Sequence, residues 1–159
     1  MRILIDNTLP EFNYSDLKDS LEKFGIKAEL LLCKINFNFI EVNVLSEWAK
    51  GLGEKILIIT DCEITNKRVL NFSVDLKGVV DDINGWVGVI SYTKVDKNFS
   101  LICAHEALHL LGLTHCHNEN CIMSIKFKDR KFIYPVYFNN KEELILCKDC
   151  QGVLDGRKN

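Results

Sequence analysis

The sequence contains 159 residues, of which 47% are hydrophobic and 26% are charged. This length and composition predict one domain with a sizeable apolar core, and they exclude a disordered or collagen-like chain. The 20 basic and 22 acidic side chains give a net charge of -2, so no global charge excess favours nucleic acid or an acidic membrane as a partner.

Targeting signals and the use of cysteines indicate the cellular location of the protein. The apolar run at the N-terminus is too short for the core of a signal peptide, and no later stretch reaches the roughly 18 apolar residues of a membrane helix. We therefore expect a cytoplasmic protein without a membrane partner, and we also expect a monomer. The cysteines number seven, and in a reducing compartment their spacing favours metal ligands over disulfides.

The first sixty residues alternate between strand and helix signals. Apolar runs and apolar–polar alternation indicate strands, whereas apolar residues at helical spacing indicate amphipathic helices. This β-α-β-α-β order predicts a mixed or parallel sheet with packed helices, because parallel neighbours need crossover connections. The predicted strands are 2–6, 26–32 and 55–60; the predicted helices are 16–24, with Ser15 as N-cap, and a segment from about residue 40 that Gly51 and Gly53 end.

The second half begins with strand-like segments, a weak one over 70–80 and a clearer one over 86–95, which we expect to pair antiparallel. A helix predicted over 97–111, with Asp96 or Asn98 as cap, is apolar on nearly every face and should cross the core. A last helix is predicted over 142–154. The fold class is therefore α/β (α+β) with a mixed twisted sheet, and we place its two subdomains at 1–112 and 113–159.

Residues 105–116 read HEALHLLGLTHC and contain the candidate chemistry. His105 and His109 are four residues apart, so on a helix their imidazoles can reach one metal ion at roughly 2.0–2.1 Å. Glu106 stands beside this metal without being a ligand, where it can hydrogen-bond a metal-bound water. Gly112 can take a positive φ and end the helix, so that His115 returns to the same ion.

This pattern predicts a catalytic zinc site with three imidazole ligands and one open position. The alternative is that the three histidines are ordinary core residues whose ring nitrogens are hydrogen-bonded and bind no metal. Gly112 and His115 at these offsets favour the metal site, and they match the metzincin form of the motif better than the zinc families whose third ligand is a distant glutamate.

Cysteines and a methionine after the histidine motif point to one family among the metzincins. His115 is followed by Cys116, Cys121 and Met123, and Cys147 and Cys150 come later as C-x2-C. The chain thus resembles an archaemetzincin, a family of minimal metzincin-type zinc peptidases with a second zinc held by four cysteines. The resemblance implies a metzincin-like fold, with a C-terminal subdomain that contains this second site. The segment 124–146 is longer than we expect for that family.

The resemblance also assigns roles outside the motif. Cys116, Cys121, Cys147 and Cys150 would hold a closed structural zinc at about 2.3 Å per sulfur, with His117 as a competing ligand. The protein would then bind two zinc ions. Met123 would be the Met-turn residue beneath the histidines, although an ordinary core methionine fits equally. Ile125 replaces a tyrosine that some metzincins place near the metal. The remaining cysteines are most simply buried small hydrophobes: Cys33, Cys62 and Cys103.

We therefore expect a metallopeptidase in which Glu106 activates a zinc-bound water against a peptide bond. The segment 86–91 could be an edge strand to which an extended peptide or protein substrate pairs, although an ordinary buried strand remains the alternative. A non-catalytic zinc-binding module, using the basic and aromatic stretch 126–131, is the second hypothesis. A metzincin-like scaffold without turnover is the third.

Overall fold

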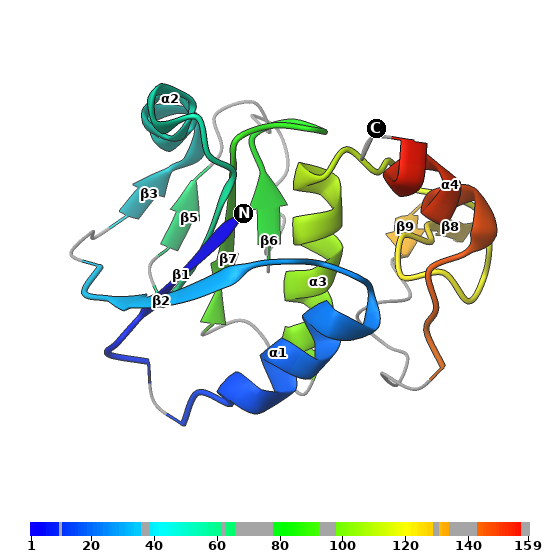
Figure 1. The fold of residues 1–159 in the computed structure, drawn as a ribbon, viewed down its shortest axis with the longest axis horizontal. Helices are drawn as coiled ribbons and strands as arrows, with labels where there is room; N and C mark the ends of the chain where they lie inside the picture. The colour runs from blue at the N-terminus through cyan, green and yellow to red at the C-terminus, as the bar shows by residue number, and fades with distance from the viewer. Residues whose placement is uncertain are drawn as a thin grey trace.

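The structure is a computed structural model with a five-stranded sheet at its centre (Figure 1). The strands lie in the order β2 (Glu29–Cys33), β1 (Arg2–Asp6), β4 (Ile56–Thr60), β7 (Val87–Ser91) and β6 (Gly78–Val80). The first four are parallel, and β6 pairs antiparallel with β7. The predicted mixed sheet is confirmed. The residues that the structure describes are 1–9, 11–35, 39–61, 63–65, 78–92, 98–128, 131–133 and 143–156.

Helices cover both faces of this sheet (Figure 1). α1 (Tyr14–Lys23) packs against α3 (Phe99–Leu110) on one face, and α2 (Val42–Leu52) packs on the other. Residues of β4 serve both layers: Leu57 points into the cluster around α1 and α3, whereas Ile58 points into the cluster around α2. A strand buried on both faces needs apolar side chains at successive positions, which explains the continuous apolar run of β4.

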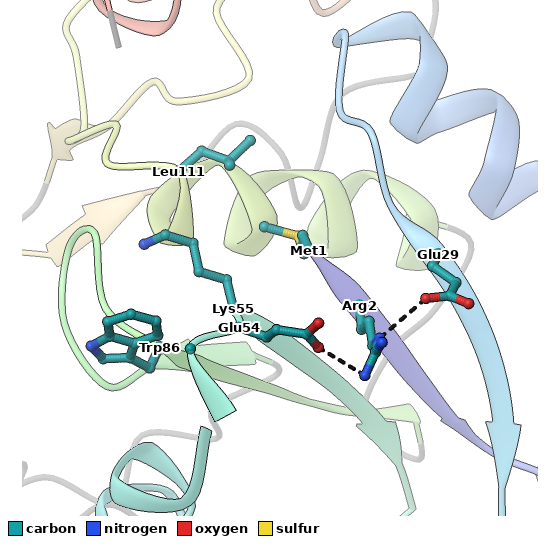
Figure 2. A pocket seen from close by; sticks show the side chains of 8 residues that line it. Met1, Arg2, Glu29, Glu54, Lys55, Trp86 and Leu111 are labelled. Atoms are coloured by element: carbon teal, nitrogen blue, oxygen red, sulfur yellow. Dashed lines mark hydrogen bonds and ion pairs between the residues drawn. The ribbon is translucent and has the colours of Figure 1, made fainter. Parts of the chain in front are cut away.

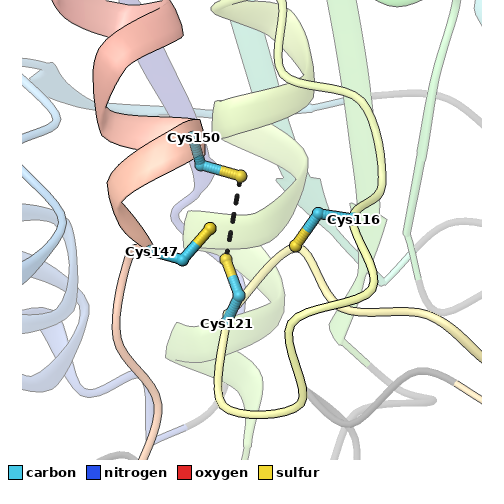
Figure 3. A group of neighbouring side chains, drawn as sticks. All are labelled: Cys116, Cys121, Cys147 and Cys150. Carbon is cyan, nitrogen blue, oxygen red and sulfur yellow. Dashed lines mark hydrogen bonds between the residues drawn. The ribbon is translucent and has the colours of Figure 1, made fainter.

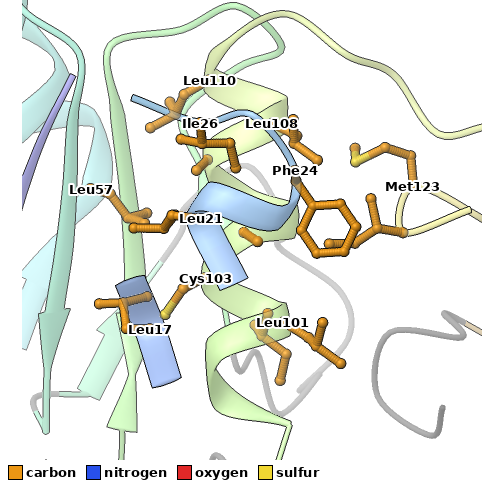
Figure 4. Close-up of a cluster of buried hydrophobic side chains, with 14 of the residues drawn as sticks. Leu17, Leu21, Phe24, Ile26, Leu57, Leu101, Cys103, Leu108, Leu110 and Met123 are labelled. Atoms are coloured by element: carbon orange, nitrogen blue, oxygen red, sulfur yellow. The ribbon is translucent and has the colours of Figure 1, made fainter. Parts of the chain in front are cut away.

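The main core fills the space between the sheet and its helices α1 and α3 (Figure 4). Every residue of α3 from Ser100 to Leu110 is buried. Its position between the sheet, α1 and the C-terminal segment explains why this helix is apolar all round. Apolar residues of that segment, including Ile122, Met123 and Leu144, belong to the same cluster. The division into 1–112 and 113–159 stays a prediction.

The smaller elements extend the two ends of this core. Two short parallel strands, β3 (Phe39–Glu41) and β5 (Glu63–Thr65), pair beside α2, and an antiparallel pair is formed by β8 (Lys126–Lys128) and β9 (Lys131–Ile133). α4 (Lys148–Gly156) lies with β8 and β9 on the side of α3 away from the sheet (Figure 1). In the part of the chain that the structure describes, no helix is long and apolar enough to cross a bilayer.

Both ends of α1 differ from the prediction. α1 begins at Tyr14 because Asn13, rather than Ser15, is its N-cap, and the Asn13 side chain accepts a hydrogen bond from the backbone N–H of Asp16 at 3.0 Å. At the other end, Gly25 adopts φ +69°, and the N–H of Ile26 donates to the carbonyl of Leu21. This is a Schellman motif, so Ile26 belongs to the helix end and β2 begins later than predicted.

The last helix starts at Lys148 rather than near 142. Residues just before it are held extended, because the N–H of Ile122 donates to the carbonyl of Ile145 and the N–H of Ile145 donates to the carbonyl of Asn120. Helical hydrogen bonds are therefore replaced there by contacts with the segment after α3.

The predicted edge strand is wrong. β7 lies between β4 and β6, with ladders on both sides, so the outer strand at this end of the described sheet is β6. Antiparallel pairing of β7 with the preceding strand is confirmed for residues 78–80. Most of the predicted segment 70–80, and residues 93–95 of the other, lie outside the described residues.

Candidate metal centres

The candidate catalytic histidines meet where α3 ends. His105 and His109 lie one turn apart on α3, and their Nε2 atoms are 3.1 Å apart. Both side chains are buried, with 3% and 4% of their surface exposed. The helix thus directs two imidazole nitrogens to one point, as the i, i+4 spacing predicts.

A sharp turn brings the third histidine to the same point. Gly112 adopts φ +94°, and the N–H of Leu113 donates to the carbonyl of Leu108, which ends α3 in another Schellman motif. The chain then reverses, and the Nε2 of His115 lies 3.1 Å from the Nε2 of His109. The structure therefore brings together His105, His109 and His115, as the sequence predicted.

Backbone carbonyls fix how two of these rings are oriented. The Nδ1 of His105 is 2.9 Å from the carbonyl oxygen of Ile122, and the Nδ1 of His109 is 2.8 Å from that of Leu113. Because a carbonyl only accepts, each Nδ1 carries the proton and donates it. Each Nε2 is then left with a lone pair that faces the other histidines, which is the arrangement of metal-ligating histidines.

The spacing and charge state of this cluster fit a metal ion. Two nitrogens at 2.0–2.1 Å from a tetrahedral zinc are about 3.3 Å apart, close to the 3.1 Å observed. Burial lowers the pKa of His105 and His109, and burial together with the charge of His109 lowers that of His115 to about 4. All three imidazoles are therefore neutral at physiological pH, as metal ligands must be.

Glu106 directly follows His105 on α3 and does not belong to the histidine cluster. Its side chain is 5% exposed, and burial raises the pKa of its carboxyl to about 8. The carboxyl is packed against Gly78 of β6, so the outer strand of the described sheet reaches Glu106. A positive ion nearby would stabilise the carboxylate and lower this pKa again.

A second cluster consists of four cysteine sulfurs that point toward one another (Figure 3). Cys116 and Cys121 come from the loop after α3, Cys150 lies in the first turn of α4, and Cys147 directly precedes that helix. The sulfurs of Cys121 and Cys150 are 3.8 Å apart. Two sulfurs at 2.3 Å from a tetrahedral zinc are about 3.8 Å apart, so this donor set fits a closed tetrahedral site.

The pKa shifts of these thiols show that a cluster of thiolates here needs a cation. Burial raises the pKa of Cys116 to about 11 and also raises that of Cys150. Burial acts in the same direction on Cys147, but hydrogen bonds from Cys150 outweigh it and lower the pKa. Four thiolates cannot gather here without a compensating cation, and a divalent metal ion is the group that deprotonates coordinating thiols.

The two clusters share one short loop. Cys116 directly follows His115, and its N–H donates to the carbonyl of Met123 at 2.9 Å. Ile122, whose carbonyl holds His105, directly follows Cys121. The same loop therefore positions ligands of both clusters. The Ile122 carbonyl was missed in the sequence, because a backbone acceptor carries no side-chain signal.

The other candidate ligands lie elsewhere. His117 is exposed and does not belong to either cluster. Cys103 is buried as predicted, whereas Cys33 is only half-buried, and Cys62 lies outside the described residues. Met123 is fully buried in the core beside α3 (Figure 4). Its role beneath the histidines stays a prediction.

A separate cavity of about 580 Å³ opens where β1 and β2 begin, and Leu111 at the end of α3 also lines it (Figure 2). Arg2 lines this cavity, where its guanidinium forms ion pairs with Glu29 at 3.1 Å and Glu54 at 2.8 Å. Lys55 and Trp86 line the same cavity. None of the clustered histidines or cysteines lines it, so it is not part of either candidate metal site.

Three solved structures with a similar fold are two archaemetzincins and a zinc-dependent peptidase. Archaemetzincin from Methanopyrus kandleri matches with a TM-score of 0.65 and 18% identity, over 99% of this chain and 95% of that one. A zinc-dependent peptidase from Methanocorpusculum labreanum matches with a TM-score of 0.66 and 16% identity, over 96% and 98%. Archaemetzincin from Archaeoglobus fulgidus, in complex with malonate, matches with a TM-score of 0.53 and 18% identity, over 96% and 99%.

These matches confirm the predicted resemblance at the level of the fold. Identities of 16–18% show a shared architecture over almost the whole chain, and no more than that. No protein-family model matches the sequence, and no curated protein matches it.

Proposed function

We propose that this chain is a zinc metallopeptidase of the archaemetzincin type, with His105, His109 and His115 as ligands of a catalytic zinc. The observation that carries the proposal is the convergence of three Nε2 atoms, with two of the rings oriented by backbone carbonyls and with a buried glutamate next to His105 in the chain. The fold shared with solved zinc peptidases supports it.

Glu106 is the proposed catalytic base. A zinc ion held by the three imidazoles would supply a water with a pKa of about 7 and would polarise a carbonyl oxygen. Glu106 would accept a proton from that water and then donate it to the leaving amine. Its burial keeps bulk water away from the carboxyl, so the proton is held between the two steps.

The proposed substrate is a peptide or protein segment bound in an extended conformation. β6 is the outer strand of the described sheet at the end that approaches Glu106, so its free edge can pair with a peptide backbone. Backbone pairing along β6 would bring the peptide close to Glu106. This assignment replaces the segment 86–91, which lies inside the sheet.

The second zinc has a structural role in this proposal. A tetrahedral ion here would be held by four thiolates, with no position left for water or substrate; the ligands would be Cys116, Cys121, Cys147 and Cys150. The expected content is therefore two zinc ions per chain. The cytoplasmic location and the monomeric state stay predictions.

A peptide-library assay read by mass spectrometry tests the proposal. The zinc-loaded protein should cleave peptides, a chelator should reduce cleavage to the background of buffer alone, and added zinc should restore it. His109→Ala should abolish cleavage because it removes a ligand, whereas His117→Ala is the matched control, since His117 is exposed and outside both clusters. A correctly folded, zinc-loaded protein without cleavage would support a scaffold or binding module instead.

A further inference from the structure

One glycine of the edge strand lies directly against the proposed catalytic base. Gly78 is buried at the start of β6, and an added Cβ there would lie 2.8 Å from Cγ, 3.0 Å from Oε1 and 3.1 Å from Cδ of Glu106. Real Cβ contacts essentially never fall below 3.0 Å. Gly78 and Glu106 therefore fit together only because residue 78 has no side chain.

Neither element can easily move to make room. β6 is held by its antiparallel ladder with β7, in which Gly78 pairs with Ile90. α3 is held by its apolar side chains, which are buried from Ser100 to Leu110. Because both backbones are fixed, the side chain of Glu106 is the part that a Cβ at residue 78 would displace.

We propose that Gly78 is a positioning residue, which lets the carboxyl of Glu106 lie against the edge strand beside the histidines. This proposal rests on the proposed function, in which Glu106 must reach both the water and the leaving amine. A side chain at residue 78 would leave the three histidines in place and would displace the side chain of Glu106 at a cost in stability. A misplacement of about 1 Å can reduce a catalytic rate about 100-fold.

The first test is a double-mutant cycle on the thermal stability of the zinc-loaded protein. Gly78→Ala should lower Tm in the wild-type background, and about half or more of that decrease should disappear in the Glu106→Ala background, because the atoms that the new Cβ meets are gone. If Gly78→Ala does not fold, the double variant should fold. Equal decreases in both backgrounds, or a double variant that also fails to fold, would overturn the proposal.

Gly88→Ala is the matched control for this cycle. Gly88 lies in the neighbouring strand β7, and an added Cβ there would lie equally close, at 2.8 Å, to Cδ1 of Leu57 instead of to the glutamate. Its effect on Tm should be the same in the wild-type background and in the Glu106→Ala background. If the decrease in Tm caused by Gly88→Ala also disappeared in the Glu106→Ala background, the double-mutant cycle would not be specific for the contact between Gly78 and Glu106. That result would overturn the proposal.

The second test distinguishes a displaced Glu106 carboxyl from a general loss of folding or of zinc. Gly78→Ala should lower kcat by about 10- to 100-fold, with KM changed far less and with an unchanged zinc content. A kcat within about twofold of wild type would refute the positioning role. If the wild type itself has no turnover, the proposed peptidase function fails, whereas the stability cycle still decides whether Gly78 is fitted to Glu106.

Discussion

Replacement of Glu106 with glutamine is expected to lower kcat by about 10²- to 10⁴-fold, the usual contribution of a general acid–base. Glutamine has nearly the same shape, so it should still fit against Gly78 and leave both metal sites filled. What it lacks is the ability to accept a proton and return it to the leaving amine. Steady-state kinetics together with zinc analysis of the same sample measures both effects.

The matched control for this variant is Glu22→Gln on α1, where the glutamate side chain is 65% exposed and pairs with Lys18. A surface ion pair of this kind contributes little to stability, so kinetics and zinc content should stay at the wild-type values. A Glu106→Gln variant that loses less than about tenfold in kcat would remove Glu106 from the role of base.

Loss of the cysteine cluster is expected to cause the largest change in stability. Apparent binding free energies of structural zinc in small domains are about 10–16 kcal/mol, comparable with the whole stability of a typical domain. The double variant Cys121→Ser, Cys150→Ser removes two sulfurs that are 3.8 Å apart. It should therefore lose one zinc ion and show a much lower Tm, measured by calorimetry and elemental analysis.

The same variant should also weaken the histidine site. The loop that carries Cys121 supplies the Ile122 carbonyl to His105, and Cys116 directly follows His115. Loss of outer hydrogen-bond partners typically reduces metal affinity about 10- to 100-fold. Cys33→Ser is the matched control, because Cys33 lies on β2 outside the cluster and should leave both sites filled. An unchanged Tm with both ions retained would contradict a structural role for the cysteines.

The histidine site could be predicted because its geometry is local. The spacing of His105 and His109 follows from the pitch of one helix, and Gly112 supplies the positive φ that brings His115 back. The four cysteines could be grouped by their spacing, since C-x4-C and C-x2-C are typical of metal ligands. These predictions needed no knowledge of how distant segments pack.

The position of the edge strand could not be predicted in the same way, because strand order depends on contacts between distant segments. One signal was nevertheless present. All residues of β7 are buried, and its sequence is apolar without alternation, which is typical of a central strand rather than an edge strand. Gly78 carried no comparable signal, since its role depends on how close β6 comes to α3.

The most direct test of the account is the zinc content of the purified protein, measured by elemental analysis on wild type and on the double variant His105→Ala, His109→Ala. We expect two zinc ions per chain in the wild type and one in the variant, because the cysteine cluster stays intact. One zinc ion per chain in both proteins would contradict a metal site at the histidines and leave only the cysteine site.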